Sequence, residues 1–400
     1  MSPQSSAGNR ARVGPLAGAG STAPVLDVDA LLDDRDTGII VCCGSGGVGK
    51  TTTSAALALR AAERGRKVVV LTIDPARRLA QSMGIEELDN TPRPVPDVAG
   101  EGSLDAMMLD MKRTFDEVVE SQASPEKAQQ ILTNPFYVAL SSSFAGTQEY
   151  MAMEKLGQIH AAARADDTYD LIVVDTPPSR SALDFLDAPE RLSRFLDGRF
   201  IRLLLAPAKG PAKLMTAGVG LVTNAMTRIL GAQVLRDMQT FVAAFDTLFG
   251  GFRQRAQKTF ELLQADGTAF LVVAAPEPDA LREAAYFVER LSEDRMPLAG
   301  LVVNRATAPP EGSLSADEAM AAYERLSRRE DGADDSPVSR TAGLLRLHAD
   351  RSRLVERERG LRTRFAAAHP QVPTAVVPAL AGDVHDLDGL RDVGHLLSGG

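Results

Sequence analysis

The 400-residue sequence predicts an α/β fold, with a mostly parallel sheet of seven to eight strands flanked by helices. Short runs rich in β-branched residues recur along the chain, and longer helical patterns separate them. The runs are almost continuously apolar, which is typical of strands covered on both faces of a parallel sheet. The seven predicted strands are residues 38–43, 67–73, 104–110, 169–175, 268–274, 298–304 and 374–378.

The clearest predicted helix follows the first strand and runs from Thr51 to Glu63. It is rich in alanine and leucine, which favour helices, and Gly65 closes it. A helix that connects two parallel strands places their carboxyl ends along one edge of the sheet. We therefore expect a ligand site at that edge.

Changes in composition divide the chain. We expect a disordered arm over residues 1–36, because the first 24 residues are rich in Ser, Gly, Ala and Pro. Residues 37–400 are predicted to form the main domain, with a helical subdomain inserted at 187–265. A further break at 309–337 carries the acidic sequence REDGADD and is predicted to be an exposed loop.

The predicted helical subdomain is basic and aromatic within an acidic protein. Residues 190–260 hold 11 Lys and Arg against 4 Asp and Glu, and half of the 14 phenylalanines of the chain. These aromatic residues form either the subdomain's own core or a groove for an apolar client with basic residues at its rim. Both interpretations stay open at the level of the sequence.

Charge and hydropathy argue against nucleic-acid-binding, secreted and membrane-spanning proteins. The net charge of −9, from 44 basic and 53 acidic residues, argues against general affinity for nucleic acids. The first 24 residues lack the apolar stretch of a signal peptide. The longest uncharged apolar stretch, 214–227, falls short of the roughly 20 residues that a spanning helix needs. We expect a soluble cytoplasmic protein without a transmembrane segment, and peripheral contact with a membrane stays open.

The two cysteines, Cys42 and Cys43, are neighbours on the first predicted strand. They can form neither a disulfide framework nor a four-ligand zinc site, so a reducing compartment is expected. Neighbouring strand residues point to opposite faces of a sheet, and one or both thiols should be buried.

A glycine-rich sequence follows the first strand and matches the pattern G-x-x-x-x-G-K-[ST] over residues 44–51. In a strand–loop–helix context this pattern predicts a P-loop NTPase, because successive backbone N–H groups converge on the nucleotide phosphates. Lys50 adds a positive charge there, and the Thr51 hydroxyl can ligate Mg²⁺. The predicted nucleotide-binding residues of this segment are Gly46, Gly47, Val48, Gly49, Lys50, Thr51 and Thr52.

Three motifs in order carry a resemblance to a known family. GGVGKTT at 46–52, IDPA at 73–76 and DTPP at 175–178 resemble the arsenical-pump and tail-anchored-protein-targeting ATPases, the anion-transporting ATPases of the deviant-Walker-A P-loop group. The resemblance runs from about Gly38 to the final helix. It implies an ATPase that uses ATP and Mg²⁺, works as a dimer and couples nucleotide state to movement of a helical subdomain that binds an apolar client.

The resemblance also assigns roles to individual residues. Asp74 would orient the attacking water and act with Lys50 as the catalytic pair, and Asp175 would lie partly in the second shell of the Mg²⁺ ion. Asn304 would read the adenine, and the turn at Pro378 and Ala379 would cover the other face of the base. Phosphoryl transfer needs these elements: a positioned water, a metal and neutralisation of charge.

One position departs from the family. Where the family has a second lysine that reaches the partner's nucleotide, this chain has Ser45. The chain could then be a slow homodimeric ATPase, or Arg77 or Arg78 could replace the charge. Alternatively, a paralogous subunit could supply the lysine in a heterodimer, or the chain could bind nucleotide without turnover. A regulatory, catalytically weak subunit is therefore the alternative to a self-sufficient ATPase.

The remaining differences concern metals and the switch segment. The adjacent cysteines argue against the zinc-bound dimer and the arsenite sensing of some relatives. Arg180, in the segment after Asp175, either senses phosphate or pairs with a surface carboxylate. We expect nucleotide state to pass from Asp175 through this segment into residues 190–260.

Overall fold

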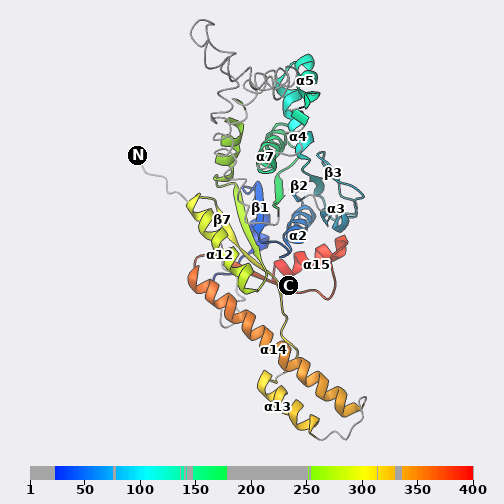
Figure 1. Cartoon of the computed structure of the whole chain (residues 1–400), viewed down its shortest axis with the longest axis vertical. Coiled ribbons are helices and arrows are strands. Elements are labelled where there is room, and N and C mark those ends of the chain that lie inside the picture. Colours follow the sequence, from blue (N-terminus) through cyan, green and yellow to red (C-terminus); the bar gives the residue numbers. More distant parts are fainter. Residues whose placement is uncertain are drawn as a thin grey trace, which may run out of the picture.

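The computed structural model describes residues 23–74, 78–135, 137–138, 141, 147–177, 251, 254–312, 314–328 and 336–399. Within these residues an eight-stranded sheet runs in the order β3-β4-β2-β5-β1-β6-β7-β8 (Figure 1). All neighbouring strands pair in parallel except β3, which is antiparallel to β4. The predicted α/β fold with a mostly parallel sheet is confirmed.

The predicted strands are all present, and their ends differ from the prediction by at most two residues. The additional strand, β3, has only two residues, both exposed, so it leaves no apolar pattern in the sequence. The strands are β1 Ile39–Gly44, β2 Lys67–Thr72, β3 Arg93–Pro94, β4 Ser103–Met108, β5 Leu171–Asp175, β6 Thr268–Ala274, β7 Leu298–Ala306 and β8 Thr374–Pro378.

Helices cover both faces of the sheet, which is why the strands are apolar on both sides. One core packs side chains of α4, α5, α7 and α12 against the sheet, and the other packs α1, α2, α3 and α15. The helices of the first face are α4 Met111–Gln122, α5 Pro125–Leu132, α7 Thr147–Asp166 and α12 Pro278–Glu293. Those of the second are α1 Val28–Asp33, α2 Lys50–Glu63, α3 Arg78–Ser82 and α15 Leu387–Leu397. No described helix combines the length and apolar character that a membrane crossing requires.

The cysteine pair lies in the middle of this arrangement. Cys43 belongs to the core on one face of the sheet and Cys42 to the core on the other, and both are fully buried. The alternation of β1 side chains produces this separation. The prediction of opposite faces and burial is confirmed.

The prediction of a disordered arm over residues 1–36 is wrong for residues 23–36. Val25 forms a parallel bridge with Thr374 at the start of β8, and Val28 and Leu32 of α1 are fully buried. The Asp27 side chain caps α1 by accepting from the Ala30 amide. These few apolar residues anchor the segment to the second face. Residues 1–22 lie outside the described part of the chain.

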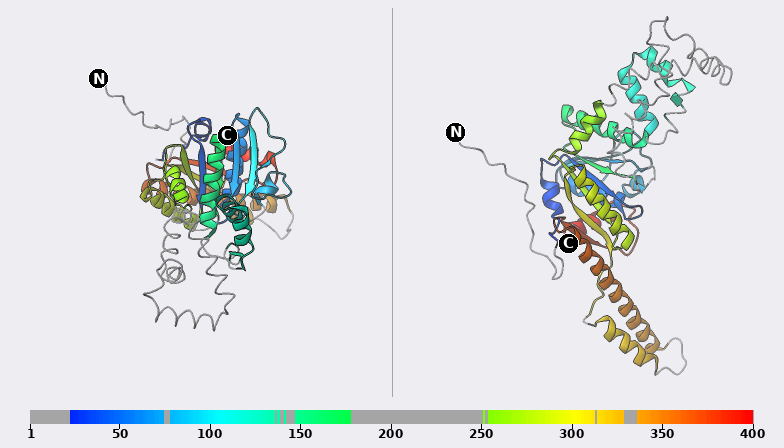
Figure 2. Two further views of the ribbon diagram at one scale, coloured as in Figure 1. Left: turned by 90° about the horizontal axis from the view of Figure 1, so that it is seen from above. Right: turned by 60° about the vertical axis from the view of Figure 1, so that its left-hand side comes forward.

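The predicted acidic loop at 309–337 is also wrong in part, because residues Ala316–Ser327 form α13. Its acidic sequence REDGADD, residues 329–335, lies outside the described residues. Ser315 and Glu318 make a reciprocal capping box at its start. Asp317 and Glu318 lie in the first turn of α13, where the helix dipole favours acidic residues. The next helix, α14 Pro337–Ala368, forms a hairpin with α13 that projects beyond the sheet (Figures 1 and 2).

Most of the predicted helical subdomain, 187–265, lies outside the described residues. Its described end, 254–263, is helical and packs Ala256 and Leu263 into the first core. The Arg255 guanidinium contacts the buried Glu154 carboxylate of α7 at 2.8 Å. This end of the region is therefore part of the packing of the main domain.

Candidate functional site

The phosphate loop connects β1 to α2 at the carboxyl edge of the sheet. Two of its glycines are required by close approach and by positive φ angles. A Cβ atom on Gly44, at φ +148°, would lie 2.1 Å from the carbonyl oxygen of Val273. A Cβ atom on Gly49, at φ +94°, would lie 2.2 Å from the amide nitrogen of Asn304. The loop is therefore packed closely against both β6 and β7.

The Lys50 ammonium is turned back onto its own loop. Its Nζ donates to the Ser45 carbonyl oxygen at 2.8 Å, and the residue is buried. Burial lowers the pKa of this ammonium, because a charged group is less well solvated inside the protein. A buried cation at the base of a loop of backbone N–H groups is suited to bind phosphate.

The carboxylate of Asp175, at the end of β5, is completely buried. Its Oδ2 accepts from the hydroxyls of Thr51 at 2.8 Å and Thr72 at 2.9 Å. Its Oδ1 is buried and has no hydrogen-bond partner among the described residues. Burial raises the pKa of Asp175 to about 6, against the lowering effect of the two hydroxyls.

These groups fit a magnesium ion. Mg²⁺ takes oxygen ligands and is usually held through one or two carboxylates, hydroxyls or waters together with substrate phosphates. The Oδ1 atom of Asp175 is an acceptor that no described residue supplies with a proton donor, and the Thr51 oxygen keeps lone pairs while it donates to Asp175. A cation nearby would also offset the cost of a buried negative charge.

Asp74 follows β2 at the same edge of the sheet. Its backbone amide donates to the Thr72 hydroxyl at 3.2 Å, so the same threonine contacts both aspartates. Asp74 is half-buried and lines the main cavity of the site. Of the two arginines that the sequence suggests as a substitute for a lysine at position 45, Arg78 lines this cavity, whereas Arg77 lies outside the described residues, as does Arg180.

A cavity of about 910 Å³ brings most of the predicted site together. Its walls come from the phosphate loop and from the ends of β2, β7 and β8. The predicted residues that line it are Gly47, Gly49, Lys50, Thr51, Thr52, Asp74, Asn304, Pro378 and Ala379. Gly46 and Val48 instead line, with Ser45, a second cavity of about 400 Å³. Asp175 lines neither cavity and lies beneath Thr51.

Asn304 is buried and donates from Nδ2 to the Val48 carbonyl oxygen at 2.9 Å. In this arrangement its amide group fixes the phosphate loop. Pro378 ends β8, and the Ala379 amide donates to the Ala306 carbonyl at 2.9 Å, which ties the following turn to β7. The structure places these residues in the cavity, and their roles toward adenine stay predictions.

Arg305 belongs to the site and has no counterpart among the sequence predictions. Its Nη1 donates to the Gly47 carbonyl oxygen at 2.9 Å, and it lines both cavities. The sequence could have pointed to Arg305 through its position directly after Asn304, near the end of a strand. The chemistry of an arginine beside a phosphate loop is that of anion binding.

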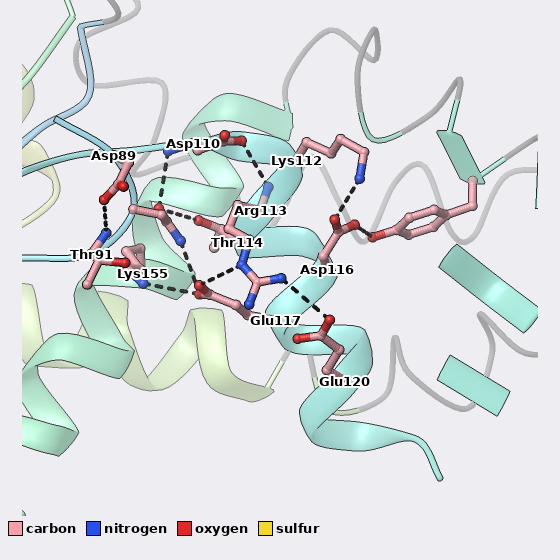
Figure 3. Close-up of polar contacts among 12 residues, drawn as sticks. Asp89, Thr91, Asp110, Lys112, Arg113, Thr114, Asp116, Glu117, Glu120 and Lys155 are labelled. Carbon is pink, nitrogen blue, oxygen red and sulfur yellow. Dashed lines mark hydrogen bonds and ion pairs between the residues drawn. The ribbon is translucent and has the colours of Figure 1, made fainter. Parts of the chain in front are cut away.

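A polar network connects the segment after α3 with α4 and α7 (Figure 3). The buried Asn90 accepts at Oδ1 from the Asp110 amide at 3.1 Å and the Thr114 hydroxyl at 3.0 Å. Its Nδ2 donates to Glu117 at 3.1 Å, and Lys155 of α7 donates to the same carboxylate oxygen at 3.1 Å. The segment between α3 and β3 is thereby attached to the helices of the first face.

Comparison with known proteins agrees with this geometry. The family model of the anion-transporting ATPases matches residues 37–321, well over half of the chain. An ATPase GET3 of Malassezia globosa is 26% identical, covering 71% of this chain and 77% of that protein. An ATPase ASNA1 homolog of Cryptosporidium parvum is 26% identical over 73% and 72% of the two chains. An ATPase GET3 of Podospora anserina is 27% identical over 72% and 78%. The chain belongs to the anion-transporting ATPase family.

Proposed function

We propose that this chain binds ATP with Mg²⁺ and hydrolyses it as a dimer. Membership of an ATPase family supports the activity. The observation that carries the proposal is the cavity in which the phosphate loop, Asp74 and Asn304 meet, with the orphaned Asp175 oxygen behind Thr51. This set provides a phosphate cradle, a carboxylate for water and an oxygen site for a cation.

The residues of the chain divide the work of phosphoryl transfer. The backbone N–H groups of the loop bind phosphate oxygens, and the Lys50 ammonium leaves the Ser45 carbonyl to neutralise their charge. Asp74 orients and accepts a proton from the attacking water. Asp175 and Thr51 would hold Mg²⁺, which supplies charge neutralisation at the phosphates when bound.

We further propose that nucleotide state reaches a helical subdomain over residues 187–265 that binds an apolar protein client. The Asn90 network supports this, because it attaches the segment that follows α3, whose Arg78 lines the cavity, to α4 and α7. A cytoplasmic site of action with peripheral membrane contact fits such a client. The route that leads from Asp175 through Arg180 is part of the proposal, and Arg180 lies outside the described residues.

A second candidate function is favoured by Ser45. Its side chain brings no positive charge to the loop, while its carbonyl oxygen binds the Lys50 ammonium. The chain would then be a nucleotide-binding, catalytically weak subunit of a heterodimer, and a paralogue would carry the missing lysine. Charge at the transferring phosphate is a large contribution to catalysis, so its loss would slow turnover.

Steady-state ATP hydrolysis by the purified chain, measured over a series of protein concentrations, tests the two functions. A specific rate that rises with concentration and is lost in Asp74→Asn would support a self-sufficient dimer. ATP binding without turnover, with activity gained in Ser45→Lys, would support the heterodimer. Absence of ATP binding by the wild-type chain would contradict both.

A further inference from the structure

Strand β7 is irregular where it reaches the phosphate loop. Its pairing with β8 shifts register between Val303 and Ala306, and Arg305 between them has a φ of +60°. In a regular strand, consecutive side chains point to opposite faces. Here two consecutive side chains bind the same loop, because Asn304 donates to the Val48 carbonyl and Arg305 to the Gly47 carbonyl, each at 2.9 Å.

This irregularity is unfavourable in itself. A left-handed backbone conformation costs free energy for an L-residue with a long side chain, and it persists only where surrounding contacts hold it. Bulges next to active sites commonly redirect a side chain. In this chain the redirected side chain is the Arg305 guanidinium, which is exposed at the loop.

Arg305 lies where it can bring to the phosphate loop the positive charge that Ser45 does not supply. The residue lines the 910 Å³ cavity together with Lys50, and it also lines the 400 Å³ cavity together with Ser45. It therefore lies at the border of the two cavities, beside Gly47. A guanidinium is always charged and has five donors, so it can keep a carbonyl contact while it binds an anion.

Lys50 and Arg305 share one arrangement. Each cation donates to a carbonyl oxygen of the phosphate loop, Lys50 to Ser45 at 2.8 Å and Arg305 to Gly47 at 2.9 Å. A phosphate in the loop is a stronger partner for a cation than a neutral carbonyl. Both side chains are therefore placed to transfer a hydrogen bond from the loop to a bound phosphate.

We propose that Arg305 contacts the phosphates of the bound nucleotide and supplies, within the same chain, the second positive charge that Ser45 does not bring. The inference rests on the proposed ATP-binding function. Its alternative is a purely structural Arg305 that only holds Gly47. The two differ in charge: a phosphate contact contributes to the salt dependence of ATP affinity, and a bond to a neutral carbonyl does not.

The test compares variants of the full-length chain by calorimetric titration with MgATP over a range of salt concentrations. Arg305→Asn removes the charge, and asparagine tolerates a positive φ, so the backbone is kept. Arg305→Lys keeps the charge. Arg351→Asn is the matched control, because Arg351 is also exposed and donates to the Ala308 carbonyl at 3.0 Å, but lines neither of these cavities.

Arg305→Asn should bind ATP about tenfold more weakly or worse at low salt, and its affinity should depend less on salt than that of the wild type. Arg305→Lys should recover most of the loss, and Arg351→Asn should match the wild type. Unchanged affinity in Arg305→Asn, or a loss that keeps the wild-type salt dependence, would overturn the inference while leaving ATP binding intact. A wild-type chain that binds no ATP would overturn the proposed function itself.

Discussion

The two edges of the sheet differ in how many hydrogen-bond partners their buried charged side chains have. At the amino edge, the Arg66 guanidinium is 1% exposed and donates to Asp170 and to the Leu32, Asp34, Thr37 and Asp170 carbonyls, at 2.7 to 3.1 Å. At the carboxyl edge, Asp175 is equally buried, but one of its oxygens has no partner among the described residues.

The difference separates a charge used for folding from a charge kept for a ligand. Arg66 joins β2 to the segments before β1 and β5 and holds the N-terminal segment in place. Lys50 and Asp175 carry the desolvation cost of burial without full compensation, as the directions of their pKa shifts show. Such groups mark sites where binding restores the balance.

The largest expected effect is on turnover. Lys50→Met should lower ATP hydrolysis by about 100-fold to 1000-fold, because a preorganised donor at the phosphates is removed. Its free energy of unfolding should not fall, since methionine fills the volume without a desolvated charge. Rate assays and urea unfolding measure the two quantities. The control, Lys67→Met, removes a half-exposed lysine at the start of β2 that pairs with Asp167. Equal losses of stability in Lys50→Met and Arg66→Met would abolish the distinction between the two edges.

Arg66→Met should have the opposite effect to Lys50→Met: a loss of stability with ATP binding unchanged. Removing a buried, fully bonded guanidinium should lower the free energy of unfolding by about 3–5 kcal/mol, because the carbonyls it serves lose their donor. The affinity of the folded protein for ATP should stay at the wild-type value. Arg64→Met is the matched control: Arg64 pairs with Asp33 and is one-third exposed, so about 0–1 kcal/mol is expected. A similar cost in both variants would show that the Arg66 contacts are not specifically stabilising.

The pH dependence of stability tests Asp175 without nucleotide or Mg²⁺. Its folded pKa of about 6 lies above the ordinary value of 3.8, so the native state holds the proton more tightly. Its contribution to stability is therefore present below pH 3.8 and is lost as the pH rises through about 6. The loss amounts to about 3 kcal/mol. The stability of Asp175→Asn relative to the wild type should therefore increase as the pH rises from 3.8 to about 6. A difference between the two proteins that does not change with pH would argue against the raised pKa.

An exposed cap offers the smallest test. Ser315→Ala should lower the stability of α13 by about 1 kcal/mol, because the capping box at its start is lost. Hydrogen exchange of α13 amides measures this locally, and amides of the sheet should not change. Ser315→Asp, which keeps an acceptor, is the control. Loss of protection in the sheet as well would mean that the hairpin of α13 and α14 is coupled to the site.

The sequence predicts the sheet and most of the site because both depend on local patterns. Buried strands are continuous apolar runs, and the phosphate loop needs its glycines in a fixed order. The missed features depend on contacts between distant segments. The role of Arg305 arises from a register shift between β7 and β8, and the orphaned oxygen of Asp175 depends on which hydroxyls lie beside it.

The errors in chain organisation have the same origin. Residues 23–36 follow a stretch rich in Ser, Gly, Ala and Pro, but burial of Val28 and Leu32 and the bridge of Val25 to Thr374 show that they belong to the fold. Residues 316–327 lie in a stretch with the composition of a loop, but Ser315 and Glu318 give them a helix start. In both places a few specific contacts outweigh composition.

The alkylation rate of the two thiols of β1 would measure how often the sheet opens. Burial raises the pKa of Cys42 to about 12 and that of Cys43 further, so neither forms the nucleophilic thiolate while the strands stay together. An alkylating reagent can therefore react only when the central strand separates from its neighbours. Because β1 leads directly into the phosphate loop, comparing the rates of alkylation with and without ATP would show how much a bound nucleotide stabilises β1 against separation from its neighbours.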